Sequence, residues 1–219
     1  MRRKAEGRLQ AIVAAAVTTF SRQGYAATQM ADIARAAAVS VGTLYLYAAS
    51  KEALFDAALA EATNAPPSES ALPLPFRGWP DVAARAEGLL TGTARWPRLD
   101  AAVAARGRPS DAAVLAVAAE LYDLIAANRR GLKLIDSCLR DIPELAGLYE
   151  NDIRGRYLDA MERFAARRCG ADKAPVLARA VVEMITWMAM HRHGDTRPIA
   201  ADEAAIRQGT IDAAASILA

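Results

Sequence analysis

The sequence predicts an all-α fold with two parts, a small N-terminal domain and a larger C-terminal one. Hydrophobic residues make up 53% of the 219 positions, which is enough for a sizeable core. Alanine and leucine dominate, runs of β-branched residues are few, and polar and apolar residues do not alternate as they do along strands. Apolar residues instead recur at helical spacing, and prolines separate the resulting segments.

The N-terminal part predicts four helices. Apolar residues at helical spacing from Leu9 to Phe20 indicate a first helix, which Gly24 should end. Residues 28–47 indicate two short helices around a tight turn, each opened by a hydroxyl residue that can cap free backbone N–H groups, Thr28 and Ser40. A fourth helix should begin after Ser50 as its N-cap.

Residues 64–80 contain five of the ten prolines and predict an extended linker. The domains are therefore expected at 1–63 and 81–219. In the second domain the pattern predicts helices at about 81–95, 98–106, 110–127, 129–141, 143–169, 173–193 and 202–218. Part of the linker should still pack against the protein, because it contains the hydrophobic residues Leu72, Leu74, Phe76 and Trp79.

The two short helices indicate DNA binding. The outward side of the second is small, polar or aromatic, as a helix in the major groove requires. Residues 1–51 hold seven basic and two acidic side chains, whereas the rest of the chain is slightly acidic. This charge distribution indicates that only the N-terminal part of the chain binds nucleic acid.

The same residues resemble the N-terminal domain of the TetR/AcrR transcriptional regulators. The resemblance covers about residues 8–60 and rests on Gly24-Tyr25, Thr28, Ile33-Ala34, Val39-Ser40, Gly42-Thr43-Leu44-Tyr45 and Ser50-Lys51-Glu52 with Leu54. Two positions differ: Ala38 stands where the family usually has glycine, and Ala48 where it usually has phenylalanine. A left-handed backbone at Ala38 would cost roughly 1 kcal/mol.

The resemblance implies a homodimeric repressor that binds an inverted-repeat operator and leaves it when a small molecule binds the C-terminal effector-binding and dimerisation domain. The DNA contacts it implies are Thr28, Ser40, Val41, Gly42, Thr43, Tyr45, Leu46, Tyr47 and Lys51. Ser40 to Thr43 and Leu46 would face base edges, whereas Tyr45, Tyr47 and Lys51 would hold phosphates. An activator, a regulator without a ligand, and a helical binding protein or enzyme with a vestigial helix-turn-helix remain as alternatives.

The effector is expected to be apolar or aromatic, because the C-terminal part collects aromatic and methionine side chains without a charge cluster. The candidate pocket residues are Trp96, Tyr122, Met184, Trp187 and Met188. Apolar residues beyond the needs of one core predict a dimer interface on the helices at 143–169 and 173–193, formed by Ile153, Tyr157, Met161, Phe164, Val181, Ile185 and Met188.

Enzymatic, metal and cofactor functions are not expected. The two histidines, His191 and His193, would point about 200° apart on a helix and could share one metal only if the helix ended before them; no nearby cysteine or carboxylate completes a ligand set. Phosphate-binding glycine motifs and a GxSxG nucleophile motif do not occur. Cys138 and Cys169 are far apart in the sequence, and we expect a reduced, cytoplasmic protein without a membrane span.

Overall fold

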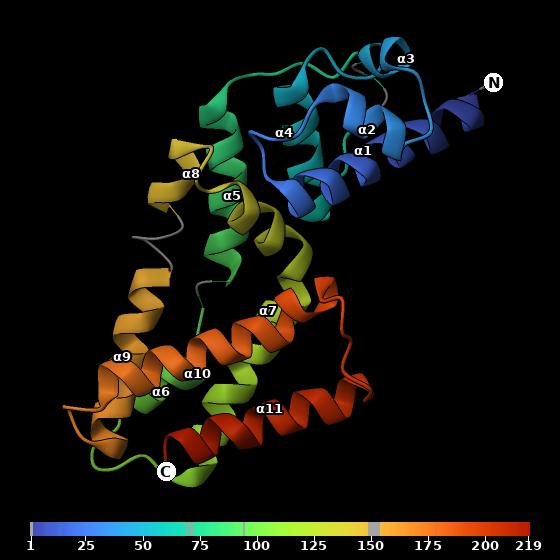
Figure 1. Cartoon of the computed structure of the whole chain (residues 1–219). Helices are drawn as coiled ribbons and strands as arrows, with labels where there is room; N and C mark the ends of the chain where they lie inside the picture. Colours follow the sequence, from blue (N-terminus) through green and yellow to red (C-terminus); the bar gives the residue numbers. More distant parts are fainter. Residues whose placement is uncertain (1, 69, 71, 94, 149–153) are drawn as a thin grey trace. The chain divides into compact units, whose positions relative to one another are not determined.

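The computed structural model describes residues 2–68, 70, 72–93, 95–148 and 154–219, and it confirms the all-α class (Figure 1). Contacts group the described chain into two compact units. Unit 1 comprises residues 1–90 and 130–149, and unit 2 comprises residues 91–129 and 150–219. The sequence had placed the boundary in the linker at 64–80. Residues 64–90 and a distant segment after residue 129 instead group with the N-terminal helices.

Unit 1 contains the helices α1 (Arg2–Gln23), α2 (Met30–Ala36), α3 (Val41–Tyr45), α4 (Lys51–Ala62) and α8 (Pro143–Gly147), most of α5 (Trp79–Thr93) and the end of α7 (Asp111–Cys138). An aromatic cluster forms part of its core. The Phe20 and Phe55 rings meet edge to face at 5.3 Å, and Tyr25 lies against both of them and against Trp79. This cluster joins α1, α4 and the start of α5.

Unit 2 contains α6 (Pro97–Ala104), the first part of α7, α9 (Gly155–Cys169), α10 (Ala174–Ala189), a short 3-10 helix η3 (His191–Gly194) and α11 (Glu203–Ile217). α10 packs against α9 on one side and α11 on the other. The fully buried Tyr122 hydroxyl donates to Glu203 at 2.9 Å, and this carboxylate also pairs with Arg192. The guanidinium of Arg192 holds the pKa of Glu203 below its usual range.

One helix boundary differs from the sequence prediction. The segments predicted at 110–127 and 129–141 form one continuous helix, α7, which runs through Gly131. The lack of a side chain at Gly131 has a packing role, since a Cβ there would lie 2.6 Å from a methyl group of Leu89. The helix predicted at 143–169 is described as α8 and α9, and residues 149–153 between them lie outside the described residues.

The proline-rich segment is largely non-helical, as predicted, although Trp79 and Pro80 already belong to α5. Leu74 is its buried anchor, and Leu74 forms an isolated parallel pairing with Ala48. None of the described helices is both long enough and apolar enough to cross a lipid bilayer.

Candidate nucleic-acid interface

The turn between α1 and α2 is built on Gly24 and Thr28. Gly24 has a φ of +81°, and the buried Thr28 hydroxyl donates to the Gly24 carbonyl at 2.6 Å. The predicted cap at Thr28 is therefore wrong, because α2 has Gln29 as its N-cap residue. The Asp32 carboxylate accepts from the Gln29 N–H at 3.0 Å, and this hydrogen bond lowers the pKa of Asp32. Thr28 shapes the turn from inside.

Lys51 closes the same turn from α4. Its Nζ donates to the carbonyls of Tyr25 at 3.0 Å and Thr28 at 3.1 Å, and it lies 4.1 Å from the centre of the Tyr25 ring. An ammonium group has three N–H donors, so one remains for a phosphate oxygen. The structure thus gives Lys51 a positioning role in addition to the phosphate contact predicted from sequence.

Tyr25 and Glu52 form a second link between this turn and α4. The Tyr25 hydroxyl donates to Glu52 at 2.7 Å. Burial and the neighbouring carboxylate both raise the pKa of Tyr25, so the phenol stays protonated and remains a donor. Burial tends to raise the pKa of Glu52, but hydrogen bonds from Ser50 and Tyr25 outweigh it and the pKa falls.

The turn between α2 and α3 contains the left-handed residue that the sequence anticipated. Ala38 has a φ of +53°, and its N–H bonds to the Arg35 carbonyl at 3.2 Å. The next residue, Val39, donates to Ala34 at 2.9 Å and completes the turn. Such a conformation costs an L-residue with a Cβ about 1 kcal/mol.

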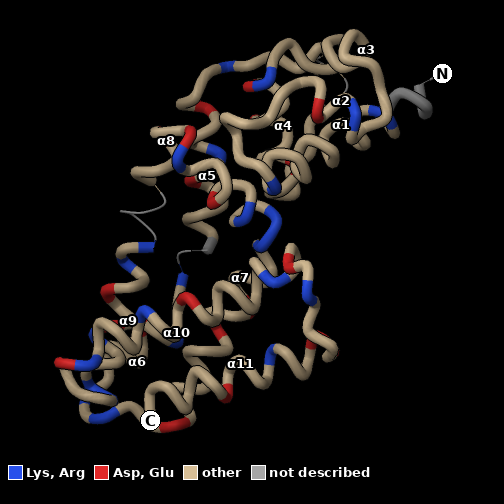
Figure 2. The backbone as a smooth tube through the Cα atoms, in the orientation of Figure 1, with Lys and Arg blue, Asp and Glu red and all other residues tan. Residues whose placement is uncertain are grey.

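Ser40 begins α3 as predicted. Its Oγ accepts from the Thr43 N–H at 3.0 Å and lies 2.8 Å from the Thr43 hydroxyl. Leu44 is buried and anchors the helix. Leu46, which directly follows the last helical residue, is 69% exposed. The other exposed or half-exposed candidates are Val41, Gly42, Tyr45 and Tyr47. α3 carries no charged residue, as Figure 2 also shows.

The residues that follow α3 are hydrogen-bonded to the proline-rich segment. The Leu74 N–H donates to the Tyr47 carbonyl at 2.8 Å, and the Ala49 N–H donates to the Leu74 carbonyl at 3.0 Å. Ala48 between them is fully buried. Leu74 therefore packs beside the position where the family usually has a phenylalanine.

A third support comes from far along the chain. The Asp141 carboxylate, which follows α7, accepts from the Ala26 N–H at 2.7 Å, and the Ser137 hydroxyl donates to the Ser21 carbonyl at 2.9 Å. A Cβ on Gly24 would lie 3.2 Å from an Asp141 oxygen and 3.1 Å from the Ser137 carbonyl. Gly24 thus permits both the backbone conformation and this close approach.

The geometry is that of a helix-turn-helix with a short, uncharged α3, in which α4 and the segment around Asp141 fix the turn before α2 and Leu74 fixes the residues after α3. The family model for bacterial regulatory proteins of the tetR family matches residues 12–58, which run from α1 through α4. This chain is a TetR-family transcriptional regulator. As a TetR-family protein it is a DNA-binding transcription factor rather than an enzyme.

Solved structures align with nearly the whole chain. A member of the TetR transcriptional regulator family from Streptomyces coelicolor is 19% identical, with 94% of this chain and 88% of that chain covered and a TM-score of 0.50. The TetR-family regulator PfmR from Thermus thermophilus is 18% identical, with 94% and 96% covered and a TM-score of 0.46. FadR from Bacillus subtilis, solved in complex with stearoyl-CoA, is 17% identical, with 94% and 97% covered and a TM-score of 0.40. No curated protein sequence matches the chain.

The residues proposed from sequence for an effector pocket have different surroundings. Trp96 and Tyr122 are buried, and Trp96 meets the Tyr157 ring edge to face at 4.7 Å. Met184 and Met188 are half-buried on α10, and Trp187 is 40% exposed on the same helix. A cavity of about 300 Å³ in unit 1 is lined by none of these five.

Sequence reasoning missed the supports that come from distant segments. Ser137 and Asp141 bond to backbone groups of α1 and of the turn before α2, and Leu74 bonds to backbone groups just after α3; no local motif encodes these contacts. The only signal for Asp141 was its place before Ile142-Pro143, which indicated a helix start rather than a contact with residue 26.

Proposed function

We propose that this TetR-family regulator acts as a homodimeric repressor that binds an inverted-repeat operator and is released by a small apolar or aromatic molecule. The observation that supports operator reading is the outward surface of α3 and the residues after it. It offers small, hydroxyl-bearing and aromatic side chains without charge, and the backbone there is held by neighbouring segments. Such a surface can enter a major groove and approach base edges.

Selection from a random DNA pool tests the operator geometry. A two-fold dimer should return an inverted repeat, with half-sites placed so that both α3 helices reach major grooves about one helical turn apart or slightly more. Footprinting on the selected sequence should then protect two symmetric half-sites. Protection of an asymmetric, unrepeated sequence would contradict the dimeric mode of binding.

Thr43→Ala should weaken binding to the selected operator, and the loss should arise at one base position. Removing a direct hydroxyl contact costs roughly 1–3 kcal/mol at that base pair and leaves binding to random DNA unchanged. Thr43→Ser is the matched control, since it keeps the hydroxyl. Fluorescence anisotropy on the operator and on single-base variants measures both. An equal loss on specific and random DNA would assign Thr43 to the backbone instead.

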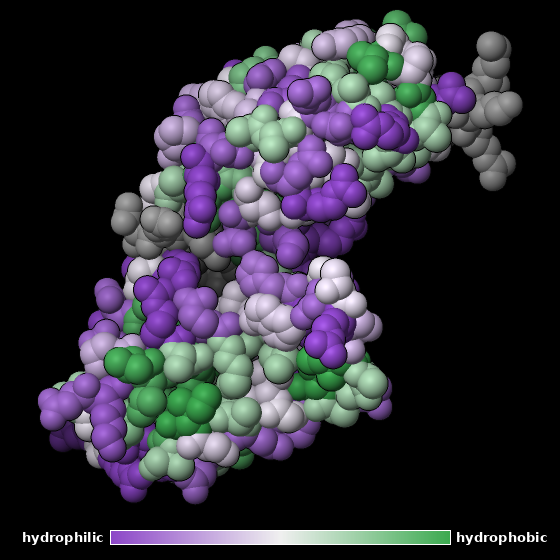
Figure 3. All heavy atoms as spheres, viewed as in Figure 1, coloured by the Kyte–Doolittle hydropathy of each residue, from purple (hydrophilic) through white to green (hydrophobic). Residues whose placement is uncertain are grey.

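The dimer surface that we propose is the outer face of α10. The apolar residues predicted for the interface are mostly inside the chain: Tyr157, Met161, Phe164, Val181 and Ile185 are buried, Met188 is half-buried, and Ile153 lies outside the described residues. Val176 is 70% exposed and Trp187 40%, and both lie on one stripe of α10 with Ala180 and Met184. Figure 3 shows hydrophobic residues gathered over this part of unit 2.

Trp187→Glu should therefore raise the dimer dissociation constant by tenfold or more, because a carboxylate would have to be desolvated in the interface. Light scattering over a dilution series measures it. Leu115→Glu is the control, since Leu115 is an exposed apolar residue of α7. A Trp187→Glu protein that stays dimeric at the wild-type dissociation constant would exclude this face.

An effector site near Trp96 has one supporting observation. The Tyr157 hydroxyl beside Trp96 is buried and has no hydrogen-bond partner among the described residues. A buried polar group of this kind usually has a partner, and a ligand's polar group would supply one. Screening small molecules for release of the selected operator would identify it, and linkage requires operator DNA to weaken ligand binding by the same factor.

A further inference from the structure

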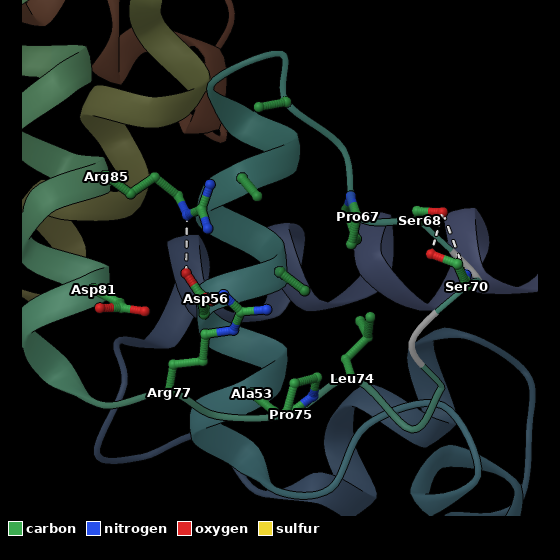
Figure 4. A pocket seen from close by; sticks show the side chains of 13 residues that line it. Ala53, Asp56, Pro67, Ser68, Ser70, Leu74, Pro75, Arg77, Asp81 and Arg85 are labelled. Carbon is green, nitrogen blue, oxygen red and sulfur yellow. Dashed lines mark hydrogen bonds and ion pairs between the residues drawn. The ribbon is translucent and has the colours of Figure 1, made fainter.

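A cavity of about 300 Å³ lies between α4 and the proline-rich segment, within unit 1 (Figure 4). Its floor is the alanine face of α4, formed by Ala53, Ala57 and Ala60, all of them buried. The facing wall comes from the proline-rich segment and is also mainly apolar, formed by Pro67, Leu74 and Pro75. Its volume is at the lower end of the range for ligand sites, which suits a small molecule rather than a long chain.

Charged side chains line one end of this cavity, opposite Ser68 and Ser70 (Figure 4). Arg85 donates to Asp56 at 2.9 Å, so these two charges satisfy each other. Asp81 lies in the first turn of α5, where the helix dipole stabilises a carboxylate. Arg77 is exposed and has no hydrogen bond or ion pair with any residue that the structure describes. Its guanidinium is the cation available to a ligand.

We propose that this cavity binds a small molecule with a single carboxylate on a short apolar body. The carboxylate would pair with Arg77, whose planar fork matches its two oxygens, and the body would cover the alanine face of α4. One available guanidinium favours a single negative charge, and Asp56 and Asp81 disfavour a second. The site is separate from the residues named above for an effector in unit 2.

Leu74 connects this site to the DNA-facing segment. It lines the cavity, and its backbone N–H and carbonyl bond to Tyr47 and Ala49, directly after α3. A molecule that fills the cavity would contact Leu74 and restrict the motion of the proline-rich segment. Binding should therefore make the two backbone hydrogen bonds more persistent, and amide exchange at Leu74 and Ala49 should slow.

Calorimetry on the full chain with benzoate and hexanoate tests the ligand class, with benzamide and hexanamide as uncharged isosteres. The carboxylates should bind, and the amides should bind at least tenfold more weakly. Arg77→Gln should weaken carboxylate binding at least tenfold, whereas Arg106→Gln, an exposed arginine of unit 2, should leave it unchanged. Amides that bind as tightly as the carboxylates would overturn the proposed ligand class.

Ala57→Leu provides an independent test, because the longer side chain would fill the cavity from its floor. It should abolish binding, while a cooperative thermal transition shows that the variant is folded. Hydrogen exchange with and without benzoate then tests the connection to α3. Carboxylate binding that survives both Ala57→Leu and Arg77→Gln would place the site elsewhere. Binding without slower exchange at Leu74 and Ala49 would overturn the connection. None of these readouts requires DNA, so the proposed operator function is not a condition of the test.

Discussion

Replacing Lys51 with alanine is expected to weaken binding to operator and random DNA alike and to loosen the turn between α1 and α2. The ammonium group bonds to the carbonyls of Tyr25 and Thr28 and lies over the Tyr25 ring. Hydrogen bonds to a charged group are each worth about 1.5–3 kcal/mol, and the half-buried position lowers that figure, so a loss of about 1–3 kcal/mol in unfolding free energy is expected. Denaturant titration measures this loss.

The proposed contact between Lys51 and a DNA phosphate can be tested separately, through the salt dependence of binding. If the third N–H of Lys51 meets a phosphate, the slope of log affinity against log salt should fall by about 1 per subunit. Lys51→Met keeps most of the aliphatic stem and removes the charge, so it separates packing from electrostatics. A variant with full stability and an unchanged salt slope would show that Lys51 holds neither the turn nor a phosphate.

Asp141→Ala is the second substitution with a large expected effect. The carboxylate accepts from the Ala26 N–H at 2.7 Å, across 115 residues of sequence. Losing a capping acceptor of this kind costs about 0.5–2 kcal/mol and leaves the Ala26 amide without a protein partner. Hydrogen exchange should therefore become faster at Ala26, and operator affinity should fall because the turn that precedes α2 becomes less ordered.

Asp141→Asn is the control, because its amide oxygen can still accept from the same N–H. It should lose less stability than Asp141→Ala and retain most of the slow exchange at Ala26. Faster exchange to the same extent in both variants would show that the negative charge, rather than the acceptor atom, orders the turn. Unchanged exchange in both would remove Asp141 from the support of the helix-turn-helix.

The sequence predicted the helix-turn-helix closely because its signals are local. Hydroxyl caps at Ser40 and Ser50, a glycine at the end of α1 and apolar spacing all act within a few residues. The N-cap predicted at Thr28 was wrong for a local reason as well, since Gln29 and Asp32 satisfy the start of α2 and the Thr28 hydroxyl donates to the Gly24 carbonyl.

Features that depend on distant segments could not be predicted in this way. The sequence predicted separate helices at 110–127 and 129–141, but the structure joins them in α7. Gly131 lies within this helix, and a Cβ there would collide with the distant Leu89 side chain. The apolar residues of α9 and α10 exceeded what a small core should need, yet most of them are buried within the single chain. Sequence spacing identifies an apolar helix face but not the helix that covers it.

The conformation of Ala38 has a stereochemical consequence. Its φ of +53° is unfavourable for an L-amino acid but lies in the region that a D-amino acid prefers. Glycine at this position would remove the steric cost and at the same time give the unfolded chain more freedom. D-alanine, introduced by chemical ligation, would keep the methyl group and match the backbone. The joint between the two short DNA-binding helices is thus a position where the mirror-image residue suits the fold better than the encoded one.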